Sequence, residues 1–178
     1  MEGLKNKIKK RERSFTLVET LVYITVLMLI VTAVILLLAW LINSAVKSKV
    51  MRETLDNAKR SMEIMVYEIK EARNIYNPTS SSSQLSLQTI KYLPDGEESS
   101  FVDFYLCGTQ LCLKKESKSP IVITSEAVKV ENLTFTKVGS DSFPSFQIDI
   151  TVSYKNPCGK PEYNALTRLI SSASLRSY

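Results

Sequence analysis

The amino-acid sequence predicts an α+β protein in which one long N-terminal helix packs on a C-terminal antiparallel β-sheet. Three observations predict this fold class. Residues 15–45 are strongly apolar, residues 46–77 place apolar and charged side chains at helical spacing, and residues 85–177 contain short strand-like runs between turns. The roughly 130 residues outside the leader and the apolar segment suffice for one domain with a modest core.

Residues 1–14 form a short basic leader. They hold six basic residues against Glu2 and Glu12, whereas the rest of the chain has 17 basic and 16 acidic residues. By the positive-inside rule, the leader stays in the cytoplasm and everything after the apolar segment lies outside. Because the excess positive charge belongs to the leader, the folded domain is not expected to bind nucleic acid directly.

The apolar segment begins at Phe15 and includes one acidic residue, Glu19. From Thr20 to Val46, 27 consecutive residues carry no formal charge, and about 20 suffice to cross a bilayer as a helix. This run is too long for the apolar region of a secretory signal peptide, which has about 7–15 residues. A carboxylate in hydrocarbon costs about 2–3 kcal/mol or more unless it lies near the membrane surface or is paired with a positive charge. Glu19 is therefore unexpected in a plain membrane anchor.

The helix is expected to continue to residue 77, because no Gly or Pro interrupts it before Pro78. Apolar residues in its second half recur at spacings of three and four, with charged residues between them, which predicts one apolar stripe. The stripe consists of Met51, Leu55, Ala58, Met62, Met65, Ile69, Ala72 and Tyr76. The remainder of the chain must cover this stripe.

The C-terminal part of the chain reads as short strands separated by turn-rich segments. The strand-like runs are LSLQTIKY, FVDFYLC, LCLKKE, IVIT, LTFTKV, FQIDITVSY and ALTRLISSASL. Alternation is clearest in one set of apolar residues that share a face, namely Phe146, Ile148, Ile150, Val152 and Tyr154. We expect an antiparallel meander with one buried face, for which the helix stripe is the natural cover.

Three cysteines occur among these strands. Cys107 and Cys112 flank the loop Gly-Thr-Gln-Leu, and a four-residue hairpin loop would place them opposite each other, within reach of a disulfide. The alternative is that both are free and reduced. Cys158 is left over, and it is either unpaired or bridges two subunits. A zinc site is not expected, since the chain has no histidine and the cysteine spacing is not that of a zinc ligand set.

The composition argues against an enzyme, and we expect no cofactor and no catalytic residue. Without histidine, His-based triads and His general bases are excluded. The sequence contains no glycine-rich phosphate loop and no metal-ligand cluster. The acidic residues of the strand region occur where solvated strand faces and turns would place them: Asp103, Glu126, Glu131, Asp141 and Asp149.

The stretch RERS-FTLVET-LVYITVLMLI resembles the N-terminus of type IV prepilins and type II secretion pseudopilins. In that family a basic leader is cut just before a Phe, the segment then reads F-T-L-x-E, and an apolar run follows. Phe15, Thr16, Leu17 and Glu19 match this pattern position for position. Ser14 departs from it, because the family nearly always has Gly before the cut.

The rest of the chain is similar to the J-type minor pseudopilins and W-type minor pilins. The segments that carry this similarity are TLDNAKRSMEIMVYEIKEARNI, FYLCGTQLCL, NLTF at 132–135 and the closing SSASLRSY. In related sequences a minor pilin sits at or near the filament tip and helps to start assembly. The resemblance therefore implies a minor subunit of a type IV pilus or a type II secretion pseudopilus, serving protein secretion, adhesion, motility or DNA uptake.

The resemblance also implies a pilin-like fold and roles for individual residues. A prepilin peptidase would cut between Ser14 and Phe15, and Phe15 would then carry a free, N-methylated amine. Glu19 would pair with the terminal amine of a neighbouring subunit. The further partners implied are other minor and major pilin or pseudopilin subunits, the inner-membrane assembly platform and the lipid bilayer.

These expectations divide the chain into three parts. They are a cleaved cytoplasmic leader (1–14), a transmembrane and assembly half of the helix (15–45), and an extracytoplasmic domain (46–178) made of the amphipathic helix 46–77 and the sheet 85–177. The chain would lie in the cytoplasmic membrane with a single pass and, after assembly, in the filament, at its tip.

One other interpretation accounts for the apolar segment and the charge asymmetry. An uncleaved single-pass anchor could present a small β-rich binding domain outside the membrane. That interpretation gives no role to Phe15 and Glu19. For Glu19 itself, the simpler alternative is an acidic residue at a helix start that interacts with the helix dipole.

Overall fold

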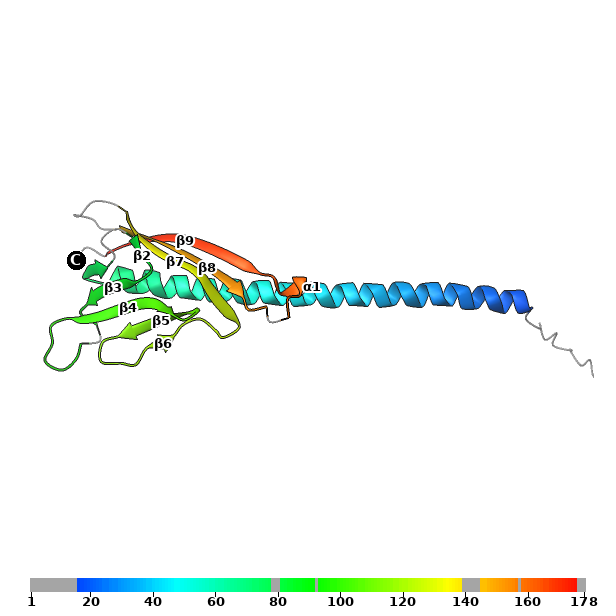
Figure 1. Ribbon diagram of the computed structural model, residues 1–178, viewed down its shortest axis with the longest axis horizontal. Coiled ribbons are helices and arrows are strands. Elements are labelled where there is room, and N and C mark those ends of the chain that lie inside the picture. The colour runs from blue at the N-terminus through cyan, green and yellow to red at the C-terminus, as the bar shows by residue number, and fades with distance from the viewer. Residues whose placement is uncertain (1–15, 78–80, 92, 139–144, 157, 176–178) are drawn as a thin grey trace, which may run out of the picture. The chain divides into compact units, whose positions relative to one another are not determined.

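The structure is a computed structural model that describes residues 16–77, 81–91, 93–138, 145–156 and 158–175. Within these ranges the chain forms one long helix, nine strands and a short 3-10 helix (Figure 1). The chain divides into two compact units, Met1–Ile42 and Asn43–Tyr178. Helix α1 (Leu17–Glu71) begins in the first unit and ends in the second.

The second unit contains two antiparallel sheets. The five-stranded sheet has the order β1-β3-β4-β5-β6 and consists of β1 (Asn74–Asn77), β3 (Leu85–Thr89), β4 (Ser100–Cys107), β5 (Gln110–Lys115) and β6 (Ile121–Val122). The four-stranded sheet has the order β2-β7-β8-β9 and consists of β2 (Ser81–Ser82), β7 (Val128–Val138), β8 (Ser145–Tyr154) and β9 (Leu166–Ser174). The 3-10 helix η1 (Pro161–Tyr163) lies between β8 and β9.

The prediction of a single meander is therefore corrected to two sheets. The sheets approach each other near the start of β7, where the N–H of Val130 donates to the carbonyl of Thr109 at 2.8 Å. Beyond that point β5 and β7 do not form a ladder. Twist accumulates along a strand, so the 11-residue β7 diverges from the six-residue β5 instead of extending its sheet.

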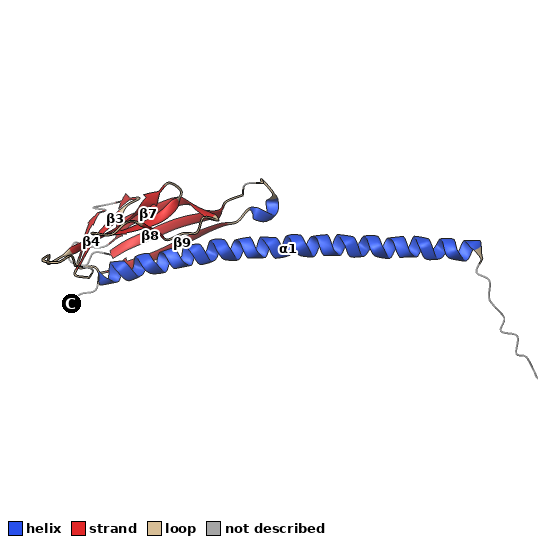
Figure 2. Ribbon diagram, turned by 90° about the horizontal axis from the view of Figure 1, so that it is seen from below, coloured by secondary structure: helices blue, strands red, loops and turns tan. Residues whose placement is uncertain are grey.

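The core lies between the C-terminal half of α1 and the inner faces of both sheets (Figure 2). The helix contributes Ala58, Met62, Met65 and Ile69. The sheets contribute Leu85, Leu87, Val102, Phe104, Leu111, Leu113, Val128, Val130, Leu133, Phe135, Ile148, Ile150 and Val152. Full burial of one such side chain stabilises the fold by about 1.5–3 kcal/mol, so this packing holds the helix on the sheets.

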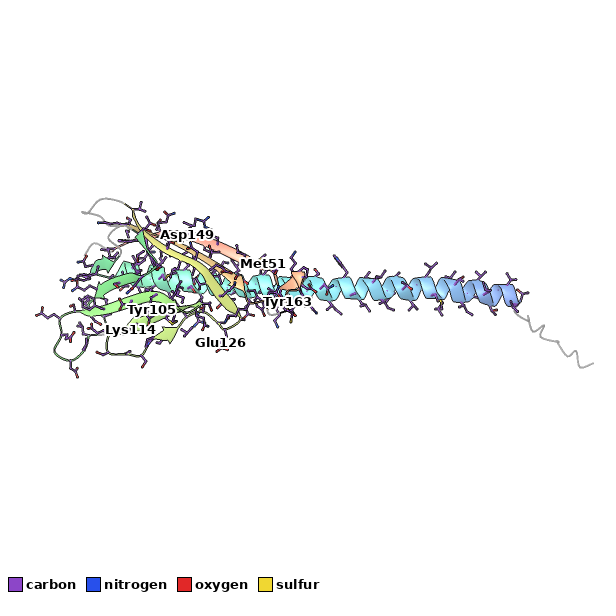
Figure 3. The ribbon with its side chains drawn as sticks, viewed as in Figure 1. Met51, Tyr105, Lys114, Glu126, Asp149 and Tyr163 are labelled. Atoms are coloured by element: carbon purple, nitrogen blue, oxygen red, sulfur yellow. A yellow bond between two sulfur atoms is a disulfide. The ribbon has the colours of Figure 1, made fainter. Side chains whose placement is uncertain are left out.

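The predicted stripe of α1 is correct at its centre and wrong at its ends. Met51 is 44 % exposed (Figure 3), and Tyr76 is 54 % exposed. The helix instead buries four residues that the stripe did not include: Val50, Thr54, Ser61 and Glu68. Residues three and four apart share a helix face, so spacings of three and four are compatible with two neighbouring faces of α1. Packing against the sheets decides which of these faces is buried.

The helix also ends earlier than predicted, at Glu71 instead of residue 77. The next residues turn back and form β1, in which Ile75 pairs with Leu87 of β3. The N–H of Arg73 donates to the carbonyl of Gln88 at 2.7 Å, which fixes this turn. The helix ends here although no Gly or Pro marks the change. Pairing of β1 with β3 outweighs the local helix propensity of these residues.

Alternation in the strand β8 is confirmed. Its inward-facing residues are buried, namely Phe146, Ile148, Ile150 and Val152. They face the helix side of the sheet, as the period of two requires. Tyr154 is half-buried at the end of the same row and stacks on Tyr163 of η1, with ring centroids 6.0 Å apart.

Candidate functional site

The predicted processing site, Ser14 and Phe15, lies outside the described residues. The cleavage and the N-methylation of Phe15 therefore stay predictions. The described part of the candidate site begins at Thr16 and continues along the first turns of α1.

Thr16 caps the N-terminus of α1. Its carbonyl accepts hydrogen bonds from the N–H groups of Glu19 (3.0 Å) and Thr20 (3.2 Å), and its hydroxyl oxygen accepts the N–H of Glu19 at 3.3 Å. A Thr at the cap with a Glu three residues later is the sequence pattern of a capping box. This local chemistry places Glu19 in the first turn, at the positive end of the helix dipole.

The carboxylate of Glu19 is exposed on the surface of the helix. The hydroxyl of Tyr23, four residues later, donates to Glu19 Oε1 at 3.5 Å. Residues four apart lie on one helix face, so this contact follows from the spacing. Tyr23 was not among the predicted site residues, although its spacing of four from the lone carboxylate of Glu19 is visible in the sequence.

Every side chain of α1 from residue 17 to residue 42 is exposed. This part of the helix includes a window of 18 residues with a mean hydropathy of 3.0, so it is long and apolar enough to cross a membrane. A soluble monomer rarely exposes an apolar surface of this extent, so the segment needs lipid or other helices around it.

The hydroxyl groups of this segment are satisfied within the helix. Thr20, Thr25 and Thr32 each donate to a backbone carbonyl three or four residues earlier, at 2.8 Å. A polar group without a partner in hydrocarbon costs several kcal/mol. The three threonines are therefore compatible with a membrane-spanning segment.

Cys107 and Cys112 form a disulfide, with Cα atoms 5.8 Å apart. The expected four-residue loop is corrected to a two-residue turn, Gly108–Thr109, across which Cys107 pairs with Gln110. Gly108 has φ +68°, and the first position of a type II′ hairpin turn requires such a positive φ, which glycine adopts readily. The two cysteines are therefore diagonal neighbours on adjacent strands, which still brings them within bridging distance.

Cys158 is exposed and takes no part in a disulfide. It lies at a hollow of about 640 Å³, together with Glu126, Ala127, Lys129, Tyr154, Lys155, Asn156 and Tyr163. In the described part of the chain, no three or more His, Cys, Asp or Glu side chains gather where they could hold a metal ion.

Glu68 is one of the charged residues that separate the apolar residues of the predicted stripe. Its side chain is 5 % exposed on the core face of α1, and Lys115 Nζ of β5 lies 3.4 Å from its Oε1. This ion pair joins the helix to the five-stranded sheet. The spacing of three from Met65, a stripe residue, was the signal that it shares the buried face.

The acidic residues expected on solvated strand faces include two that form ion pairs. Arg168 of β9 donates to both carboxylate oxygens of Asp149 on β8, with Nε at 3.0 and 3.2 Å and a terminal nitrogen at 2.5 Å. This guanidinium lowers the pKa of Asp149 below its usual range. The pKa of Glu131 is lowered by hydrogen bonds from Lys129 and from Ser153.

Asn57 on α1 holds the loop between β6 and β7. Its side-chain oxygen accepts the N–H of Ser125 at 2.8 Å, and its side-chain nitrogen donates to the carbonyl of Glu53 at 2.9 Å. Together with the buried ion pair, this contact fixes the helix against the sheets by polar interactions as well as by apolar packing.

The comparisons with known proteins identify the N-terminal segment. Residues 9–39 match the prokaryotic N-terminal methylation motif. The matched residues include the end of the basic leader, the predicted cleavage site, Glu19 and most of the apolar run. Neither the curated proteins nor the solved structures gave a match. The chain thus has the N-terminus of a type IV prepilin-like protein, on an apolar helix that indicates a membrane anchor.

Proposed function

We propose that this chain is a minor pilin or pseudopilin, a structural subunit that helps to initiate or cap a type IV pilus or a type II secretion pseudopilus. The observation that carries the proposal is the methylation motif at residues 9–39, joined to an exposed apolar helix with Glu19 in its first turn. The assignment to a minor subunit of the J or W type rests on similarity of sequence segments alone.

The proposed processing creates the charge that Glu19 needs. Cleavage between Ser14 and Phe15 exposes the amine of Phe15, which is then N-methylated. At neutral pH an amine carries a positive charge and a carboxylate a negative one, so the two groups attract each other. Pairing Glu19 with the amine of a neighbouring subunit compensates the desolvation of both, whereas loss of one partner leaves a buried charge that costs several kcal/mol.

The exposed apolar helix supplies the other half of the assembly mechanism. In the membrane its surface faces lipid, and in a filament it packs against the same segment of neighbouring subunits. The partners are then the prepilin peptidase, other pilin or pseudopilin subunits and the inner-membrane assembly platform. The folded unit stays outside the cytoplasm, where a disulfide such as Cys107–Cys112 persists.

The test is the N-terminus and intact mass of the full chain, expressed with and without a prepilin peptidase. With the peptidase, the mature chain should begin at Phe15 and carry one added methyl group. Ser14→Gly is the matched variant, because it restores the residue usual before the cut and should be processed at least as fast. If both chains keep the N-terminus of the precursor, the proposal is wrong.

A second candidate follows from Ser14, which stands where the family pattern has Gly. If Ser14 defeats cleavage while Ser14→Gly is processed, the natural chain is an uncleaved single-pass anchor that presents the β-rich unit outside the membrane. The same mass measurement decides between the two functions.

A further inference from the structure

The contact between Tyr23 and Glu19 ties the candidate assembly acid to a second side chain of the same helix. Side chains in an α-helix lean toward the N-terminus, so the ring of Tyr23 leans over the turn that carries Glu19. Its hydroxyl donates to Oε1 at 3.5 Å. Among the described side chains, this hydroxyl is the donor that reaches the Glu19 carboxylate.

The neighbouring hydroxyls are engaged elsewhere. Thr20 and Thr25 are close to Glu19 in sequence, but each hydroxyl donates to a backbone carbonyl of its own helix at 2.8 Å. Tyr23 is different because its ring is too long to bend back to such a carbonyl, and its hydroxyl extends to the height of the carboxylate. A carboxylate has four acceptor positions on two oxygens, so a contact at Oε1 leaves acceptor positions for a further donor.

We propose that Tyr23 is a positioning residue for Glu19, which holds one carboxylate oxygen so that the other is presented to the terminal amine of the neighbouring subunit. The inference rests on the proposed function, because the amine exists only after processing. Before assembly, the same hydroxyl partly replaces the water that the carboxylate loses in the membrane. After assembly, it orients the carboxylate in a charge-assisted pair.

The experiment separates the hydroxyl of Tyr23 from its ring. Tyr23→Phe keeps the ring and removes the donor, whereas Tyr23→Gln removes the ring and keeps a donor that reaches four residues back. The full chain is expressed with its peptidase in the cells that assemble it. The fraction of mature chain recovered in sheared filaments or cross-linked complexes is compared with the fraction left in the membrane.

The Phe variant should assemble about threefold to tenfold less efficiently than the natural chain, the range expected for one hydrogen bond within a membrane. The Gln variant should recover most of that loss. Thr25→Val is the matched control, because it deletes a nearby hydroxyl that bonds to the backbone, and it should assemble as the natural chain does.

The possible failures are distinguishable. If Glu19→Ala assembles normally, the pairing in the proposed function is wrong, and the role of Tyr23 falls with it. If Glu19→Ala is defective but Tyr23→Phe assembles normally, the proposed function stands and the positioning role is wrong. A Phe variant that works and a Gln variant that fails would show that the ring packs and the hydroxyl has no role.

Discussion

Replacing Lys115 by methionine should strongly destabilise the folded unit, because it removes the ammonium that lies beside the buried carboxylate of Glu68. The side chain of Glu68 is 5 % exposed and that of Lys115 is 16 % exposed, with 3.4 Å between Nζ and Oε1. Removal of the ammonium leaves a carboxylate between α1 and β5 without this counter-charge. Breaking a buried pair in this way costs about 3–5 kcal/mol, and some access to water at Lys115 favours the lower figure.

The opposite substitution should cost less. Glu68→Gln leaves the ammonium of Lys115, whose long side chain can extend to solvent, so we expect a loss of about 1 kcal/mol. Replacing both residues by methionine should restore most of the stability, since an apolar pair of similar volume fills the same space. A buried ion pair thus predicts that Lys115→Met loses the most stability and that the double variant is almost as stable as the natural chain.

The assay is chemical denaturation of the full chain in detergent micelles, followed by circular dichroism and tyrosine fluorescence. Lys114→Met is the matched control, because Lys114 is the exposed neighbour of Lys115 on the same strand (Figure 3), and its loss should shift the stability by less than about 0.5 kcal/mol. If Lys115→Met is no less stable than Lys114→Met, or if the double variant is as unstable as Lys115→Met, the reasoning is refuted.

Three further predictions concern the same unit. Because Arg168 lowers the pKa of Asp149, this ion pair stabilises the fold above about pH 4, and its contribution is lost as the pH falls through the lowered value. Asp149→Asn should therefore cost about 0.5–1 kcal/mol at pH 7 and progressively less as the pH falls below about 4, which melting curves over this pH range will measure. Replacing both Cys107 and Cys112 by serine should cost about 2 kcal/mol for so short a loop, and a reductant should lower the melting temperature of the natural chain but not of this variant. Asn57→Ala should cost about 1–2 kcal/mol, since it leaves the backbone N–H of the β6–β7 loop without its acceptor, and hydrogen exchange should show faster opening of that loop.

Local pattern was enough to predict the long helix up to its last turns and seven of the strands, but not β1 or β2. The uncharged run of residues 20–46 and the absence of Gly and Pro predicted α1, and its apolar half was predicted to be a membrane span. Alternation predicted β8, whose inward row is buried as expected. These features follow from composition and period within one segment, so they need no knowledge of distant residues.

Some residues of the candidate site were predictable from the sequence, and one was added by the structure. Glu19 was recognisable as a lone acid at the start of an apolar segment, and its match to the methylation motif comes from the same local stretch. The roles of Ser14 and Phe15 stay predictions until the N-terminus of the mature chain is measured. Tyr23 entered only with the structure, although its spacing from Glu19 was already present in the sequence.

The sequence by itself determined the long helix, most of the strands and which segment is apolar enough for a membrane, because these properties depend on neighbours a few residues away. Only the tertiary structure decided which face of α1 is buried, where α1 ends, how the strands divide into two sheets, and that Glu68 lies in the core beside Lys115. Each of these depends on pairing between segments far apart in sequence. Such contacts can outweigh local propensity by a few kcal/mol.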